Sequence, residues 1–291
     1  MTLAQDHPTR RPSRPVRRRA GRWRLPSARH AVLLPLSLFM VAPFVYMLAA
    51  SVMSETELHR FPPAIIPSGV DLGGYRKVLA ESDFQRWFLN SVIVSTTVVV
   101  SQVVLCSMAG YAFARMRFFG GRTVLTLILA TTLVPFQLTV IPTFLVFSKV
   151  HLVDTLPALI VPQLASALGV YLMTSFFRGF PRELEEAARM DGCSRWGVFF
   201  RVVLPVARPA IAALAVIMFI YSWNDLFWPL VAITSEDKYT VQVGLATFQG
   251  QHKADWSQIM AGTVLATVPV LVIFLVGQRR FVQALSGAVK G

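Results

Sequence analysis

Acidic side chains gather in one short stretch of this chain, Gly179–Pro205, which lies between two strongly apolar segments. Glu183, Glu185 and Glu186 stand close together in it, and Asp191 follows. Carboxylates on a short helix can bind a basic surface of another protein, or the helix can lie flat on lipid headgroups. Because anionic lipid would repel an acidic helix, protein docking is the preferred interpretation and the lipid-bound helix is the alternative.

The same stretch predicts two helices joined by a sharp turn. Residues 182–190 are good helix formers, and Asp191-Gly192 ends this helix because glycine tolerates the positive φ of a C-terminal cap. Ser194 can cap the second helix, which runs to Pro205. Helical spacing predicts one narrow apolar face on the first helix, formed by Leu184, Ala187 and Ala188.

Other kinds of chemistry find little support in the sequence. The two cysteines and five histidines show no metal-ligand spacing, so no metal site is expected. No glycine is followed by lysine, so the chain lacks the P-loop that cradles ATP phosphates. No nucleophile and base are arranged as in an enzyme. A proton-coupled carrier needs ionisable groups inside the membrane, and Asp225 is the only acid in an apolar window.

The composition indicates a membrane protein. Of the 291 residues, 54% are hydrophobic and only 15% are charged, whereas about 25% is usual for a soluble domain. The net charge of +13 does not indicate nucleic-acid binding, because the basic residues lie between apolar blocks. Windows of at least 20 mostly apolar residues, enough to cross a bilayer, occur at residues 30–54, 87–114, 123–148, 155–177, 209–234 and 256–278. The sequence therefore predicts an all-α protein with six transmembrane helices.

The distribution of lysine and arginine predicts the orientation. Of the 28 basic residues, 21 fall in the segments that are internal if the N-terminus is cytoplasmic: 1–29, 115–122, 178–208 and 279–291. Both termini are therefore expected to be cytoplasmic, and so is the acidic loop 178–208. Residues 1–29 are expected to be a disordered basic arm, and residues 30–291 the transmembrane domain.

Two groups of residues inside the apolar windows are candidates for a transport pathway or gate. Pro135 removes a backbone donor and can kink its helix, and polar and aromatic side chains follow it. The candidates are Pro135, Phe136, Gln137 and Thr139 in the third window, and Trp223, Asn224 and Asp225 in the fifth. The alternatives are plain kinks, and an Asp225 bonded to neighbouring helices beside Trp223 and Trp228 in an interfacial aromatic belt. Small residues predict close packing of the second and fourth spans: Ser107, Ala109, Gly110, Ser166, Ala167 and Gly169.

A spaced motif in the acidic loop resembles a known signature. Glu186-Ala187-Ala188, three residues, Gly192, nine residues and Val202-Val203-Leu204-Pro205 resemble the EAA motif of bacterial ABC-importer permeases, with Val202 a mild departure. The segments "GYAFARMRF", "LVPFQLTVIPTF", "YSWNDLFWPL" and "SGAVKG" are similar to the second permease subunit of carbohydrate importers of the maltose/glycerol-phosphate type. The resemblance runs from about residue 30 onward.

This resemblance implies a type I ABC-importer permease fold in the bacterial plasma membrane. It implies a second permease subunit, two ATPase subunits that bind ATP and magnesium, and an extracytoplasmic solute-binding protein as partners. No cofactor is then expected in this chain. The docking residues that it implies are Glu185, Glu186, Ala187, Ala188, Asp191, Gly192, Leu204 and Pro205. The transported solute would be a sugar or a related compound; a permease for another solute and an ion-coupled carrier are the alternatives.

Overall fold

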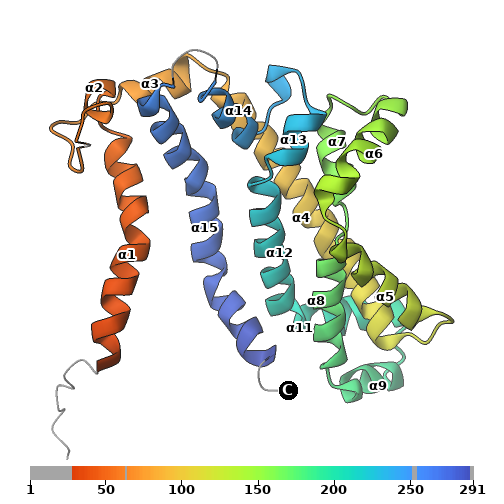
Figure 1. Cartoon of the computed structure of the whole chain (residues 1–291). Helices are drawn as coiled ribbons and strands as arrows, with labels where there is room; N and C mark the ends of the chain where they lie inside the picture. The colour runs from red at the N-terminus through yellow and green to blue at the C-terminus, as the bar shows by residue number, and fades with distance from the viewer. Residues whose placement is uncertain (1–27, 63, 251–253, 289–291) are drawn as a thin grey trace, which may run out of the picture. The chain divides into compact units, whose positions relative to one another are not determined.

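A computed structural model describes residues 28–62, 64–250 and 254–288 (Figure 1). The predicted arm, residues 1–29, lies almost entirely outside the described residues. The described residues divide into two units, one before and one after the boundary between Val45 and Tyr46. Within the described ranges all regular secondary structure is helical. The predicted all-α class is therefore confirmed.

The described part of the chain is a succession of helices. In chain order they are α1 (Ala28–Ala50), α2 (Glu55–Leu58), α3 (Gly73–Ala80), α4 (Phe84–Arg115), α5 (Gly121–Ala130), η1 (Thr131–Leu133), α6 (Phe136–Lys149), α7 (Leu156–Ile160), η2 (Val161–Gln163), α8 (Ala167–Arg178), α9 (Arg182–Met190), α10 (Arg195–Val198), the π-helical turn η3 (Phe199–Val203), α11 (Leu204–Val206), α12 (Arg208–Trp223), α13 (Phe227–Ala232), η4 (Glu236–Lys238), α14 (Val241–Thr247) and α15 (Trp256–Ala288). By length and composition four segments can span a membrane, and the number is up to six if each of two bent helix pairs forms one span.

Several of the predicted spans are not continuous helices. The third window bends by 102° between Leu133 and Phe136, with Pro135 at the bend. The fifth window begins at α12 but breaks after Trp223, and α13 continues it only from Phe227. The fourth window is interrupted between η2 and α8. Proline explains the bend before α6, because it lacks the backbone donor that a continuous helix needs.

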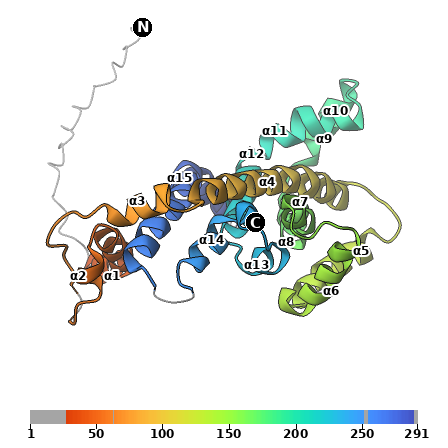
Figure 2. The same cartoon turned by 90° about the horizontal axis from the view of Figure 1, so that it is seen from above.

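Helix α4 forms the packing centre of the second unit. Its buried face contacts α8 and α12, and Figure 2 shows α5 and α6 on one side of α4 and α9 to α11 on the other. A Cβ added to Gly110 would lie 2.6 Å from Met173 Cβ and 2.8 Å from Thr174 N. The predicted close packing of the second and fourth spans is therefore confirmed, because only glycine allows α8 to approach α4 so closely.

The segments that join the spans are fixed by polar contacts to helix ends. Lys77 in α3 pairs with Asp255, just before α15. Trp87 at the start of α4 donates from Nε1 to the Glu236 carbonyl at 2.9 Å. Lys238 pairs with Asp154 at 2.8 Å and so joins η4 to the α6–α7 connection. These contacts hold the connecting segments at the end of the bundle opposite α9 (Figure 1).

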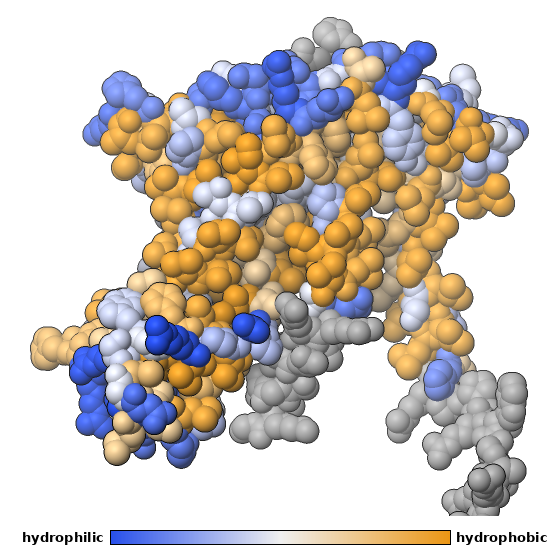
Figure 3. All heavy atoms as spheres, turned by 180° about the vertical axis from the view of Figure 1, so that it is seen from behind, coloured by the Kyte–Doolittle hydropathy of each residue, from blue (hydrophilic) through white to orange (hydrophobic). Residues whose placement is uncertain are grey.

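The outer surface of the second unit is apolar between two hydrophilic ends. Figure 3 shows the apolar side chains as a broad orange band, with hydrophilic side chains above it and in the lobe that contains α9. Large exposed apolar residues that contribute to it include Leu145, Val146, Leu271, Val272 and Leu275. An exposed apolar surface of this extent fits lipid contact or contact with another membrane subunit.

Candidate functional site

Helix α9 occupies residues 182–190, the range that the sequence predicts. At its C-terminal end, Gly192 has φ +82°, and its N–H donates to the Arg189 carbonyl at 3.0 Å. Cys193 N–H donates to the Ala188 carbonyl at 3.0 Å, which completes a Schellman motif. Ser194 Oγ accepts from Gly197 N–H at 3.1 Å and caps α10. The predicted helix, glycine stop and serine cap are all confirmed.

A buried ion pair fastens α9 to the end of α4. Arg115 Nε lies 3.0 Å from Glu185 Oε1, and the two side chains are 6% and 7% exposed. Tyr111 Oη donates to Glu185 Oε2 at 3.0 Å, and Arg189 Nη2 lies 3.9 Å from the same oxygen. Arg115 also donates to the Phe180 carbonyl. A charge pair so enclosed is fixed in position, because separating it would leave an uncompensated charge in an apolar setting.

The buried face of α9 differs from the predicted apolar face. Ala188 is buried as expected, but Leu184 and Ala187 are exposed, and Glu185 takes the inward position beside Ala188. Of the predicted apolar face Leu184, Ala187 and Ala188, only Ala188 is therefore part of the buried side of α9. Spacing alone could not reveal this, because the inward carboxylate is stabilised by Arg115 on another helix.

The outward face of α9 combines acidic and apolar groups. Glu186 and Ala187 are exposed there, and Asp191 and Gly192 are exposed at the turn that follows. Met190 is 89% exposed. A mixed surface of carboxylate and apolar groups is suited to contact with a protein surface that carries basic and apolar groups.

The last two predicted docking residues lie away from α9. Leu204 and Pro205 form most of α11, between η3 and α12, and both are only partly exposed. Leu204 packs against the apolar cluster that includes Val203 and Ala207. The helical segment from α10 to α11 then meets α12 at a bend of 74°. These two residues therefore connect the α9 region to α12 and do not share its exposed surface.

Polar side chains join two of the helix breaks to each other and to α4. Gln102 on α4 donates from Nε2 to the Gln163 carbonyl at 2.9 Å and accepts from Ser166 Oγ at 2.7 Å, which places it against the break before α8. Gln163 Nε2 in turn donates to Asp225 Oδ2 at 3.3 Å. Asp225 lies in the break between α12 and α13 and accepts from Trp228 N–H at 3.4 Å. The alternative that Asp225 is hydrogen-bonded to neighbouring helices is thus confirmed.

The third break contributes aromatic contact to the same region. The Phe136 ring, at the start of α6, lies 6.4 Å from the Phe227 ring and 6.1 Å from the Trp228 ring between centroids. Pro135 and Gln137 are exposed beside it, and Thr139 bonds its own helix through the Phe136 carbonyl at 2.9 Å. The structure therefore brings the candidates around Phe136 to the helix that follows Asp225.

The two tryptophans beside Asp225 do not form an interfacial belt. Trp223 and Trp228 are each only 1% exposed. Trp223 Nε1 donates to the Ala266 carbonyl on α15 at 3.0 Å, and Trp228 Nε1 donates to the Ala158 carbonyl on α7 at 2.9 Å. The belt prediction is wrong because both indoles find backbone partners inside the bundle. Asn224, by contrast, is exposed and accepts from Gln242 Nε2 at 3.3 Å.

Four residues of these two regions are absent from the sequence-based candidates. Tyr111 and Arg115 hold Glu185, and Gln102 and Gln163 connect the helix breaks. The glutamines carried a usable signal, because a polar amide inside an apolar window usually bonds across helices. Arg115 carried none, because an arginine at the end of a span is ordinarily an interfacial anchor.

The described side chains do not assemble a metal site. Among the residues that the structure describes, no three histidine, cysteine, aspartate or glutamate side chains lie together as ligands. The two candidate regions are the exposed face of α9 and the group of polar helix breaks around Asp225.

Comparison with known proteins matches this architecture. The sequence profile described as "Binding-protein-dependent transport system inner membrane component" matches residues 102–286. The arabinooligosaccharides transport system permease protein AraQ of Halalkalibacterium halodurans is 35% identical over 255 residues, covering 86% of this chain and 91% of that protein. The trehalose transport system permease protein SugB of Mycobacterium tuberculosis is 37% identical over 232 residues, covering 78% and 85%.

A solved structure is similar as well. A crystallised bacterial ABC transporter involved in the import of the acidic polysaccharide alginate contains a chain that is 25% identical, with a TM-score of 0.79. The match covers 87% of this chain and 95% of that one. The predicted permease fold is therefore confirmed. This chain belongs to the family of inner membrane components of binding-protein-dependent transport systems.

Proposed function

We propose that this chain forms half of the membrane pathway of an ATP-driven ABC importer for a carbohydrate or a related solute. The observation that carries the proposal is α9, which exposes Glu186 while its other face is locked to α4 through Glu185 and Arg115. The chain has no P-loop, so the energy for transport has to arrive from a separate ATPase through such a surface. ATP and magnesium bind to that partner, and this chain holds no cofactor.

The proposed docking surface is the outward face of α9 and its turn. Glu186 meets a basic group of the ATPase, and Ala187 and Gly192 let the partner's backbone approach closely, whereas Ala188 packs on the inner side of α9. Glu185 belongs to the same functional unit, but its role is to orient α9 from the inside, since it is buried against Arg115. Leu204 and Pro205 pass the displacement of the loop to α12.

The geometry supports a route for motion from α9 to the pathway. Arg115 ties α9 to α4, and α10, η3 and α11 continue from α9 into α12. Both α4 and α12 lead toward the region of Asp225, where Gln102 and Gln163 connect the helix breaks. When two ATPase subunits close on ATP, they move α9 as a rigid body, and the breaks allow the helices to change direction without unfolding.

The proposed pathway uses the polar and aromatic residues at the breaks. Phe136 offers a ring against which a sugar can stack, and Gln137, Thr139 and Asn224 offer hydrogen-bonding groups. Asp225 shapes this region through its bonds to Gln163 and Trp228 and is not a proton carrier. The partner permease supplies the other half, and an extracytoplasmic binding protein delivers the solute.

The carbohydrate class comes from the relatives. AraQ and SugB are described as permeases for arabinooligosaccharides and trehalose, and the similar crystallised transporter is involved in the import of alginate.

The proposed topology has both termini and α9 in the cytoplasm of a bacterium, a basic arm at residues 1–29 and the transmembrane domain at residues 30–291. Labelling single cysteines introduced at Asp191 and Glu236 with a membrane-impermeant maleimide in intact cells, with Cys106 and Cys193 replaced, tests the topology. Glu236→Cys should react and Asp191→Cys should not.

The transport activity is tested in proteoliposomes that contain this chain, its partner permease and the ATPase. We expect uptake of labelled oligosaccharides that requires ATP and the binding protein and persists when the proton gradient is collapsed. Uptake by this chain alone, driven by a proton gradient, would support an ion-coupled carrier instead. A matched Gln137→Met variant should lower uptake of the accepted sugar without changing assembly, because Gln137 is exposed and lies away from α9.

A further inference from the structure

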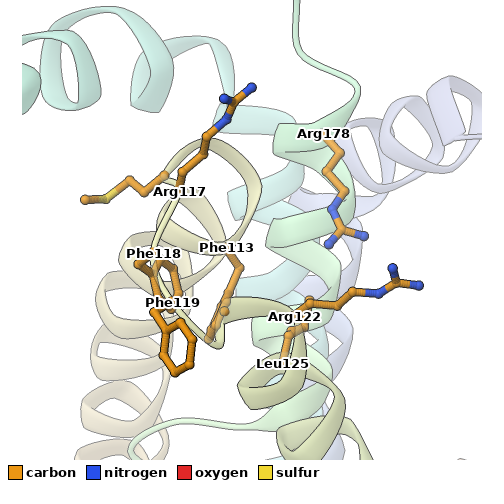
Figure 4. A pocket seen from close by; sticks show the side chains of 9 residues that line it. Phe113, Arg117, Phe118, Phe119, Arg122, Leu125 and Arg178 are labelled. Carbon is orange, nitrogen blue, oxygen red and sulfur yellow. The ribbon is translucent and has the colours of Figure 1, made fainter.

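An arginine-lined pocket opens where the ends of three apolar helices meet, and neither the docking surface nor the pathway uses it. It lies between the end of α4, the start of α5 and the end of α8, and its volume is about 710 Å³. Figure 4 shows the guanidinium groups of Arg122 and Arg178 near each other on one side of the pocket, while Arg117 lies above and to the left with its guanidinium turned away from them. No acidic residue lines the pocket. It therefore presents concentrated positive charge without a built-in counterion.

The three arginines have no ion-pair partner within the described part of the chain. This distinguishes them from Arg115 on the same stretch of sequence, which is buried against Glu185. Arginine guanidinium groups match the geometry of phosphate oxygens and bind them with two parallel hydrogen bonds. Three arginines without an acidic partner at one pocket therefore point to a phosphate-bearing ligand.

The aromatic residues of the pocket separate a lipid from a free phosphate compound. Phe119 is fully exposed at the tip of the α4–α5 connection, and Phe118 is 45% exposed. Phe118 packs on Phe113 at 5.6 Å between ring centroids, but Phe119 has no comparable ring contact among the described residues. A fully exposed phenylalanine beside arginines fits a membrane interface, where the ring enters the acyl region and the cations face phosphates.

The position of the pocket along the helices agrees with headgroup depth. Arg178 is the last residue of α8, and Arg122 lies in the first turn of α5. Arg117 follows the end of α4 by two residues. α4 and α8 end at this level and α5 begins there, as expected where the hydrocarbon region gives way to headgroups.

We infer that this pocket binds the headgroup of an anionic phospholipid. Arg122 and Arg178 hold the phosphate, Arg117 adds to the local field, and the ring of Phe119 lies among the acyl chains. The bound lipid fixes the α4–α5 connection beside the helix that carries α9. The inference rests on the proposed function only for the leaflet that supplies the lipid, which is the cytoplasmic one if the proposed orientation holds.

Native mass spectrometry of the full chain in detergent tests this site. The chain is titrated with dioleoylphosphatidylglycerol, with dioleoylphosphatidylcholine and, separately, with inorganic phosphate as a competitor. We expect the wild-type chain to retain phosphatidylglycerol at least tenfold more strongly than phosphatidylcholine. Each arginine removed should weaken phosphatidylglycerol binding about fivefold, so Arg122→Gln/Arg178→Gln should abolish the preference.

Matched variants separate the site from general electrostatics and from misfolding. Lys149→Gln removes an exposed cation from the last turn of α6, away from this pocket, and should keep the full preference. Arg178→Lys keeps the charge but loses the two parallel hydrogen bonds, so it should weaken binding less than Arg178→Gln does. Phe119→Ser should weaken retention of phosphatidylglycerol, because it removes the contact with the acyl chains.

Three results would overturn the inference. The first is equal retention of the two lipids by the wild-type chain, and the second is an unchanged preference in the double arginine variant. The third is full displacement of phosphatidylglycerol by inorganic phosphate at micromolar concentration, which would make the pocket a site for a soluble phosphate compound. Normal ATP-driven uptake in the double variant, together with any of these results, would leave the proposed transport function standing.

Discussion

Arg115 Nε lies 3.0 Å from Glu185 Oε1, and both side chains are almost fully buried. This pair joins the end of α4 to the inward face of α9, and Tyr111 Oη donates to the other carboxylate oxygen, Glu185 Oε2. The residue next to Glu185, Glu186, is exposed. Two adjacent glutamates thus have opposite surroundings, one fixing the helix to the bundle and the other available to a partner.

Removing one member of the buried pair should destabilise the chain strongly. Arg115→Met leaves Glu185 without its counterion, and the expected loss is about 3–5 kcal/mol. The double variant Arg115→Met/Glu185→Met should recover most of that loss, because apolar side chains of similar volume can replace a buried pair. Thermal unfolding of the purified variants in detergent measures both effects. An exposed-site control, Lys149→Met, should leave the melting temperature unchanged, and a single Arg115 variant as stable as the control would show that the buried ion pair does not stabilise the chain.

The turn after α9 should require glycine. Gly192 has φ +82°, and a side chain in this left-handed region costs about 1–2 kcal/mol, so Gly192→Ala should lower stability by that amount. Gly192→Asn should cost less, because asparagine tolerates this conformation better. Gly179→Ala is the matched control: its φ is −78°, and an added Cβ would come no nearer than 3.6 Å to a neighbouring atom. Equal effects of the two alanine variants would argue against the conformational explanation.

The amide network at the helix breaks should contribute to stability, and the exposed polar residues should not. Gln102→Met leaves the Gln163 carbonyl and the Ser166 hydroxyl without a bond that each makes now, which should cost about 1–3 kcal/mol. Gln137→Met should not change the melting temperature, since Gln137 is exposed. Measuring melting temperature and uptake on both variants separates structure from pathway. An unaltered melting temperature for Gln102→Met would show that the breaks do not depend on this network.

The ion pair between Lys77 and Asp255 should give a pH-dependent contribution to stability. Burial raises the pKa of the Asp255 carboxyl, but hydrogen bonds from Lys77 and Ser257 outweigh burial and hold that pKa below its ordinary 3.8. The hydrogen bond to Asp255 raises the pKa of Lys77 above its ordinary 10.5. The contribution is therefore full between about pH 5 and pH 9. The contribution is lost in acid, as the pH drops below 3.8 and through the lowered pKa of Asp255. It is also lost in base, as the pH increases above 10.5 and through the raised pKa of Lys77.

The size of this effect should be modest, because both side chains are partly exposed. Comparing wild type with Asp255→Asn by thermal unfolding at a series of pH values should give a difference below about 1 kcal/mol near neutral pH. The difference should shrink in acid. A difference that grows as the pH falls below 4 would contradict the assigned sign.

Local patterns in the sequence predicted the elements that depend on local physics. The bounds of α9, the turn at Gly192 and the cap at Ser194 depend on helix propensity and on backbone conformations that few residues adopt. The six apolar windows depend on length and composition. In each case the residues that decide the structure are neighbours in the chain.

What the sequence did not predict depends on partners far along the chain. Glu185 points inward because Arg115 lies 70 positions earlier on α4, and Trp228 is buried because the Ala158 carbonyl accepts from its indole. The 102° bend at Pro135 was expected only as a kink. Burial, ion pairing and helix direction are set by tertiary contacts. The apolar windows of the sequence do not predict these contacts.

The central claim is that the exposed face of α9 binds an ATPase and couples it to import. The most direct measurement is the amount of ATPase that co-purifies with Glu186→Lys, with ATP-driven sugar uptake measured on the same preparation. Glu236→Lys makes the same charge change at an exposed position near α14, on the opposite end of the bundle, and serves as the control. The account predicts loss of ATPase binding and of uptake for Glu186→Lys, with both retained in the control. Normal assembly and normal uptake by Glu186→Lys would contradict it.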